Sequence, residues 1–155
     1  MSTRFSLQDE ARTRQLGAVL ARYRPDSALV HLSGDLGAGK TTLARGFIQA
    51  CGHPGQVKSP TYTLMESYAL PDVTIHHLDL YRLGDPEELE YLGLDELEGP
   101  GNIALVEWPE RGEGVLPAAS LSLHLAHRPN GREVTAIAHI PEAEEWLSRV
   151  AAHFE

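Results

Sequence analysis

The segment from Gly34 to Thr41 most constrains what this chain can fold into, because it reads GDLGAGKT and fits the pattern G-x-x-x-x-G-K-[S/T] at each fixed position. An apolar run at 27–32 precedes it and a helix-like stretch at 42–50 follows it. A glycine-rich turn between strand and helix points backbone N–H groups inward, and the helix N-terminus adds positive partial charge. In this arrangement Lys40 reaches the β- and γ-phosphates and the Thr41 hydroxyl binds Mg²⁺. The segment therefore predicts a site for a nucleoside triphosphate.

The size and composition of the chain predict one globular domain, residues 1–155. A chain of 155 residues can bury a proper core but is too short for two ordinary domains. Its 42% apolar and 23% charged residues are typical of folded, soluble proteins. The sequence has no apolar stretch long enough to span a bilayer and no signal-peptide core at its start. With the single cysteine, Cys51, these features predict a cytoplasmic protein.

The charge balance disfavours direct contact with nucleic acid. Asp and Glu number 22 against 13 Lys and Arg, which gives a formal net charge of −9. Affinity for a nucleic-acid backbone comes mainly from Lys and Arg, so any link to RNA is expected to run through a partner. A histidine metal site is also disfavoured, because only His76 and His77 are adjacent and a strand points them to opposite faces. We interpret both histidines as structural.

Apolar runs and helical patterns alternate along the chain, which predicts an α/β fold. We interpret Ser6–Asp9 as the cap of a first helix and Asp85, before Pro86, as the cap of a later short helix. Pro129–Gly131 is expected to join two strands as a hairpin near the sheet edge. Strands are expected at 27–32, 73–79, 103–106, 121–125 and 134–138, with further helices at 42–50 and from 142.

Two acidic residues, Asp79 and Glu107, stand at the ends of apolar strands. Open α/β sheets place their ligand crevice at this end of the strands, and a phosphate loop needs an acid to hold Mg²⁺. Either carboxylate can bind Mg²⁺, directly or through water, or orient the attacking water, and the sequence does not divide these roles. A solvated strand-end carboxylate is the simpler alternative for each. We predict that Lys40, Asp79 and Glu107 carry the catalysis.

The hydroxyl-rich segment Ser59–Thr63, which contains Thr61, is the candidate sensor of the γ-phosphate. Hydroxyls in a loop can contact the γ-phosphate or the metal and release it after hydrolysis. Such loops are also ordinary turn chemistry. Trp108 directly follows Glu107, so its ring is expected beside the nucleotide, with a place in the core as the alternative.

Five segments in order give the chain a more specific likeness: 34–42, 58–64 (KSPTYTL), 79–83 (DLYRL), 86–90 (PEELE) and 106–110 (VEWPE). In these motifs the chain resembles the TsaE (YjeE) family, the small bacterial ATPase subunit of the tRNA threonylcarbamoyladenosine machinery. The resemblance runs from about Glu10 to Pro117. The Ser-Pro-Thr-Tyr-Thr and Glu-Trp-Pro elements are more diagnostic than the phosphate loop.

This resemblance implies a fold, cofactors and partners. The fold is a three-layer α/β fold like that of P-loop NTPases, with central parallel strands flanked by antiparallel ones. The cofactors are ATP and Mg²⁺, with weak intrinsic ATPase activity, and the partners are the TsaD and TsaB subunits. In that system TsaD transfers the threonylcarbamoyl group to adenosine 37 of tRNA, and the small ATPase is required for turnover. Contact with tRNA is therefore expected only through the complex.

The resemblance also assigns roles to matching positions. Thr41 and Glu107 become Mg²⁺ ligands, and Asp79 becomes the acid of the second nucleotide-binding motif, which we also include among the metal ligands. The segments 59–63 and 107–108 become two switch-like regions, and Glu10 is placed near the adenine. The residues expected to bind the nucleotide are Glu10, Gly37, Ala38, Gly39, Lys40, Thr41, Thr42, Thr61 and Trp108.

Three other functions compete with this interpretation. A small-molecule or nucleotide kinase of the P-loop class needs an acceptor pocket and a lid with several arginines, but Arg111, Arg128, Arg132 and Arg149 are scattered along the sequence. A GTPase is disfavoured because no Asn-Lys-x-Asp segment is present. The third alternative is a nucleotide-dependent binding module whose hydrolysis is incidental.

Overall fold

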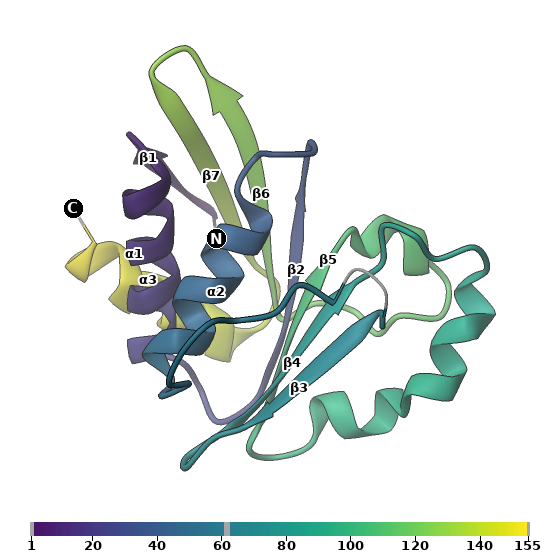
Figure 1. Cartoon of the computed structure of the whole chain (residues 1–155). Coiled ribbons are helices and arrows are strands. Elements are labelled where there is room, and N and C mark those ends of the chain that lie inside the picture. Colours follow the sequence, from purple (N-terminus) through teal and green to yellow (C-terminus); the bar gives the residue numbers. More distant parts are fainter. Residues whose placement is uncertain (1, 61–62, 155) are drawn as a thin grey trace.

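A mixed sheet forms the centre of the computed structural model, which describes residues 2–60 and 63–154 (Figure 1). Within these residues the strand order is β1-β7-β6-β2-β5-β4-β3. Strands β6, β2, β5 and β4 run parallel to one another. On one side β7 pairs antiparallel with both β6 and β1, and on the other side β3 pairs antiparallel with β4. The strands are β1 (Ser2–Leu7), β2 (Ala28–Gly34), β3 (Met65–Ala69), β4 (Thr74–Asp79), β5 (Asn102–Glu107), β6 (Leu121–Arg128) and β7 (Gly131–Ala138). The expected α/β fold with central parallel strands is confirmed.

Helices and short 3₁₀ segments cover opposite faces of this sheet (Figure 1). The two faces are visible on β5, where Ile103 and Leu105 join the core under the α-helices, and Ala104 and Val106 join the core under the 3₁₀ segments. Alternation along a strand places successive side chains in these two layers. The helices are α1 (Glu10–Arg22), α2 (Lys40–Ala50) and α3 (Pro141–His153), and the 3₁₀ segments are η1 (Pro86–Leu92), η2 (Leu94–Glu98) and η3 (Pro109–Gly112). Among the described helices, none has the length and apolar character needed to cross a membrane.

The N-terminal segment differs from the prediction. Ser2–Leu7 is a strand that pairs with β7, and α1 is capped by Asp9, whose side chain accepts a hydrogen bond of 2.9 Å from the Arg12 backbone N–H. Phe5 and Leu7 alternate into the core, so burial of their side chains favours a strand over an early helix start. The predicted hairpin β6–β7 therefore lies one strand inside the edge of the sheet.

The single helix expected after Asp85 is also replaced, by η1 and η2. Asp85 caps η1 as predicted, accepting a hydrogen bond from the Glu87 backbone N–H. Gly93 then adopts a left-handed conformation, with φ of 71°, and interrupts the helix. Leu89 and Leu97 on either side of this break are both buried in the core beneath the segment. Both leucines thus remain in the core although the segment is divided into two shorter elements.

Candidate nucleotide-binding site

The phosphate loop joins β2 to α2 in a conformation that depends on glycine. Gly37 and Gly39 have φ angles of 78° and 107°, in the left-handed region that favours glycine. A Cβ atom on Gly39 would also lie 2.8 Å from Nη1 of Arg132 and 3.3 Å from Cγ2 of Thr13. Within the described chain, no side chain caps the N-terminus of α2, which begins at Lys40. Its first backbone N–H groups are thus left for an anionic ligand.

A cavity of about 460 Å³ opens over this loop, within the size range of small-molecule sites. Most of the predicted nucleotide-binding residues line it. The exceptions are Ala38, which is buried beneath the loop, and Thr61, which lies outside the described residues. Ser59 of the candidate sensor lines the cavity as well, whereas Thr63 donates a hydrogen bond to Glu66. The lining residues are Glu10, Leu36, Gly37, Gly39, Lys40, Thr41, Thr42, Ser59, Asp79, Tyr81, Arg82, Glu107, Trp108 and Arg132.

Lys40 lies against the loop and is almost fully buried. Its Nζ donates hydrogen bonds of 2.6 Å to the Gly34 carbonyl and 2.9 Å to the Asp35 carbonyl. The same atom lies 4.2 Å from the centre of the Trp108 ring, a cation–π contact. Burial lowers the pKa of Lys40, and the nearby Glu107 carboxylate partly opposes that shift. The loop thus holds a positive charge at the floor of the cavity.

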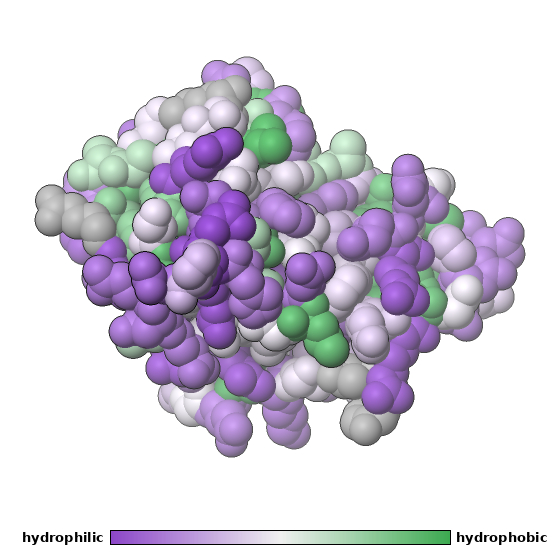
Figure 2. Space-filling view, turned by 90° about the horizontal axis from the view of Figure 1, so that it is seen from above, coloured by the Kyte–Doolittle hydropathy of each residue, from purple (hydrophilic) through white to green (hydrophobic). Residues whose placement is uncertain are grey.

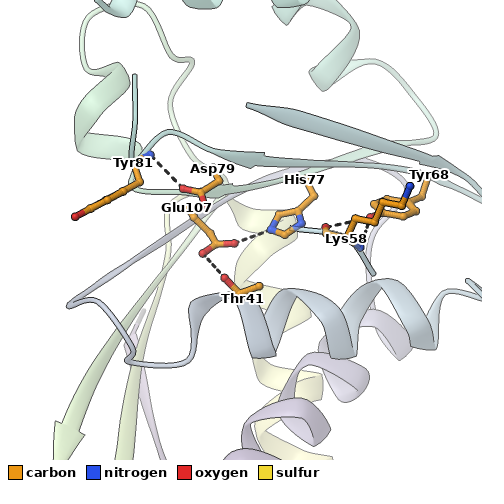
Figure 3. A network of polar contacts seen from close by, with 7 residues as sticks. All are labelled: Thr41, Lys58, Tyr68, His77, Asp79, Tyr81 and Glu107. Atoms are coloured by element: carbon orange, nitrogen blue, oxygen red, sulfur yellow. Dashed lines mark hydrogen bonds and ion pairs between the residues drawn. The ribbon is translucent and has the colours of Figure 1, made fainter. Parts of the chain in front are cut away.

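Glu107, at the end of β5, connects the phosphate loop to β4 (Figure 3). Its Oε1 accepts a hydrogen bond of 2.8 Å from the Thr41 hydroxyl, and its Oε2 lies 2.7 Å from Nε2 of His77. The Glu107 side chain is only 3% exposed, and His77 is fully buried. A carboxylate this deep needs such hydrogen bonds to offset its desolvation. Thr41 and Glu107, both expected as Mg²⁺ ligands, thus lie in direct contact with each other.

Asp79 lies directly beside Glu107 because β4 and β5 pair these two residues in register. Its Oδ1 accepts a hydrogen bond of 3.1 Å from the Tyr81 backbone N–H (Figure 3). Burial raises the pKa of Asp79, and the negative charge of Glu107 raises it further. The Tyr81 and Trp108 rings pack together at 5.0 Å beside this pair of acids. Both predicted strand-end carboxylates thus face the phosphate loop from the same side of the sheet.

The chemistry of these side chains fits Mg²⁺ held together with a nucleotide. In residues 2–60 and 63–154 no group of three or more His, Cys, Asp or Glu is placed to hold a metal by itself. Mg²⁺ usually keeps several waters and binds through one or two carboxylates plus the phosphates of a substrate. The Thr41 hydroxyl with the Asp79 and Glu107 carboxylates supplies such a partial set of oxygen ligands.

Two residues that we had not placed in the site belong to its surroundings. His77, which we interpreted as structural, contacts Glu107 directly. The sequence did contain a signal for this, because residues two apart in a strand share a face and His77 therefore lies on the same face as Asp79. Arg132, counted among scattered arginines, reaches the phosphate loop from β7. No local pattern could have shown this, because the contact depends on the hairpin folding back across the sheet.

Comparisons with known proteins agree with the geometry. The chain matches the family model "Threonylcarbamoyl adenosine biosynthesis protein TsaE" over residues 7–134. It is 45% identical over 126 residues to the tRNA threonylcarbamoyladenosine biosynthesis protein TsaE of Haemophilus influenzae, covering 81% of this chain and 80% of the relative. The Bacillus subtilis protein of the same name is 36% identical over 124 residues, covering 79% and 77%.

A solved structure has the same fold. The crystal structure of YdiB from Bacillus subtilis superimposes with a TM-score of 0.84 and 27% sequence identity, over 100% of this chain and 97% of that one. The family match covers the phosphate loop, both strand-end acids and the β6–β7 hairpin as far as residue 134. This chain therefore belongs to the TsaE family of threonylcarbamoyl adenosine biosynthesis proteins.

Proposed function

We propose that this chain is the Mg²⁺-dependent, ATP-binding and ATP-hydrolysing subunit of the bacterial machinery that makes N6-threonylcarbamoyladenosine at position 37 of tRNA. It acts in the cytoplasm with TsaD and TsaB and permits their repeated turnover. One observation carries the proposal: the buried carboxylate of Glu107 is hydrogen-bonded to Thr41 of the phosphate loop. This pairing supports the proposal because P-loop proteins hold Mg²⁺ between the hydroxyl of the loop and a nearby acid.

Different groups at the phosphate loop bind the phosphates and the Mg²⁺ ion. The N–H groups at the start of α2 and the ammonium of Lys40 neutralise the phosphates. To do so Lys40 exchanges its hydrogen bonds to the Gly34 and Asp35 carbonyls for phosphate oxygens. Mg²⁺, when bound, supplies charge stabilisation to the phosphates during transfer. Thr41 and Glu107 together offer it oxygen ligands.

Asp79 is proposed to act on the attacking water rather than on the nucleotide. Its carboxylate lies beside Glu107 in the lining of the cavity, where it can accept a proton from a water near the γ-phosphate. The Tyr81 backbone N–H donates a hydrogen bond to Oδ1 of Asp79 and so holds that oxygen in place at the end of β4. Glu107, whose two oxygens are already occupied by Thr41 and His77, is better suited to a fixed role at the metal.

Docking on the partner subunits is proposed to involve the rim of the nucleotide cavity. Leu36, at the tip of the phosphate loop, is 70% exposed although it is apolar. Tyr81, also exposed, packs at a tilt against the Trp108 ring, and Arg111 lies 5.3 Å from the centre of the Tyr81 ring. Exposed apolar and aromatic side chains with an arginine are typical of interface centres. Their place at the cavity couples nucleotide binding to docking.

A reconstituted multiple-turnover assay tests this function. Lys40→Ala removes the charge aimed at the phosphates, so ATP affinity measured by calorimetry should fall at least about tenfold, or roughly 1.4 kcal/mol. With an activated threonylcarbamoyl donor supplied, formation of threonylcarbamoyladenosine by TsaD and TsaB on tRNA should then stop after about one round per complex, as it should when this chain is left out. The matched control is Arg149→Ala, which removes an exposed cation on α3 that pairs with Glu145. The control should sustain wild-type turnover.

Two results would refute the proposal. One is unchanged ATP binding by a folded Lys40→Ala variant, and the other is sustained modification without this chain. A kinase would instead show phosphate transfer to an added acceptor without the partner subunits. A simple binding module would support turnover equally well with a non-hydrolysable ATP analogue.

A further inference from the structure

His77 lies wholly inside the protein on β4, on the same face of the sheet as Asp79. Its Nε2 atom is 2.7 Å from Oε2 of Glu107 (Figure 3). An ionised carboxylate only accepts hydrogen bonds, so Nε2 is the nitrogen that carries the proton and donates it. The imidazole and the Thr41 hydroxyl therefore contact different oxygens of the Glu107 carboxylate.

The other ring nitrogen of His77 distinguishes it from the neighbouring histidine among the described residues. Nδ1 of His77 is buried and has no hydrogen-bond partner in the described part of the chain. The adjacent His76, on the opposite face, uses both nitrogens: Nδ1 lies 2.8 Å from the Ser67 hydroxyl and Nε2 lies 2.9 Å from Oδ1 of Asn102. His76 thus connects β4 to β3 and β5 through both ring nitrogens. Among the described residues the ring of His77 makes one hydrogen bond, to Glu107, and its second nitrogen is buried without a partner.

We propose that His77 is a positioning residue for Glu107, and that it acts on the reaction only through that carboxylate. Its hydrogen bond fixes the rotation of the carboxylate so that Oε1 meets the Thr41 hydroxyl at the phosphate loop. Partners of this kind orient a metal-binding side chain without touching the metal. The inference rests on the proposed function, since Glu107 needs a fixed orientation only if it serves Mg²⁺ at the loop.

The decisive variants are His77→Ala and His77→Gln, because the glutamine amide can restore a donor near the position of Nε2. In His77→Ala, we expect the ADP affinity measured by calorimetry without Mg²⁺ to stay within about twofold of wild type. The strengthening of ADP binding by Mg²⁺ should be reduced, and kcat for ATP hydrolysis with the partner subunits should fall at least about tenfold. His77→Gln should recover most of both losses.

The matched control is His76→Ala, which removes a buried histidine of the same strand with two hydrogen bonds. It should lower the melting temperature but leave the Mg²⁺ effect and kcat close to wild type. The inference is overturned if His77→Ala changes these two quantities no more than His76→Ala does. If His77→Ala does not fold, His77→Gln and His77→Asn decide, since asparagine is too short to reach Glu107. Equal kcat and Mg²⁺ effect in both folded variants would also overturn it.

Failure of this inference and failure of the proposed function are distinguishable in the same experiments. If wild type binds ADP more tightly with Mg²⁺ and hydrolyses ATP, while His77→Ala behaves like wild type, then only the role of His77 is wrong. If wild type itself shows no effect of Mg²⁺ on nucleotide binding, the proposed function is wrong and His77 has no metal-facing carboxylate to position.

Discussion

At the scale of single residues, Trp108 has a conformation that the sequence could not reveal. Its φ of 57° and ψ of 50° lie in the left-handed region, which is uncommon for a bulky residue. Such strained residues cluster at ligand and switch sites. The conformation directs the ring over the Lys40 ammonium and against Tyr81. The order Glu107-Trp108 predicted a ring near the acids, but the contact with Lys40 depends on this turn.

This contact predicts that Trp108 fluorescence reports the nucleotide state. Phosphates that draw Lys40 away from the loop carbonyls also change the charge beside the ring. In a Trp146→Phe variant, whose only tryptophan is Trp108, emission should therefore differ between the nucleotide-free, ADP-bound and ATP-analogue-bound protein. The measurement is a steady-state titration, with a thermal melt to verify that the core variant is folded.

The reverse variant, Trp108→Phe, is the control for that titration. It retains Trp146, which is buried on α3 and donates a hydrogen bond of 2.9 Å to the Leu20 carbonyl. Its emission should not respond to nucleotide. Identical spectra of the Trp108-only protein in all three states would contradict the expected change of charge beside the Trp108 ring.

At the scale of elements, local sequence signals were sufficient where each element carries its own pattern. The unit of β2, phosphate loop and α2 could be predicted because the strand, the glycines and the helix are adjacent in sequence. The position of β1 could not, because its partner β7 lies at the other end of the chain and strand pairing is non-local. The same limit hid Arg132, although both acids of the site followed from their own strands.

The packing of β7 against the phosphate loop predicts a role for Arg132 in nucleotide binding. It pairs with Leu7 in the β1–β7 ladder, and its Nη1 is buried near Gly39 without a hydrogen-bond partner among the residues that the structure describes. A guanidinium in this position forms strong charge-assisted bonds to phosphate oxygens. It lies by Gly39 and Thr13, so the contact should be made equally by ATP and ADP. Arg132→Ala should weaken both affinities about tenfold, roughly 1.4 kcal/mol, in calorimetry.

A second arginine of the same hairpin provides the control. Arg128 is half-exposed, pairs with Glu133 at 2.8 Å, and does not line the cavity over the phosphate loop. Arg128→Ala should leave nucleotide affinity unchanged, because an exposed ion pair contributes little. If Arg132→Ala lowers ATP affinity but not ADP affinity, then the guanidinium meets the γ-phosphate instead. If neither affinity changes, Arg132 has no part in nucleotide binding.

At the scale of the whole molecule, charge is the property that the sequence specifies most completely. Asp and Glu exceed Lys and Arg by nine, and no folding pattern alters that difference. Figure 2 views the end of the sheet at which the phosphate loop lies, and hydrophilic side chains dominate it, with hydrophobic ones in small separate groups. The sequence does not specify which part of this surface meets a partner, because that depends on side chains brought together from distant segments.

The net charge predicts that the isolated chain binds tRNA poorly. A polyanion gains affinity from cations that displace its counterions, whereas a protein of charge −9 repels it at long range. In fluorescence anisotropy at about 0.15 M salt, labelled tRNA should show no saturable binding to this chain at micromolar concentration. When TsaD and TsaB are added, the labelled tRNA should bind to the complex of these subunits. Tight, salt-sensitive binding by the chain alone would mean that its few basic residues, among them Arg82 and Arg132 at the cavity, form a local cationic surface that outweighs the total charge.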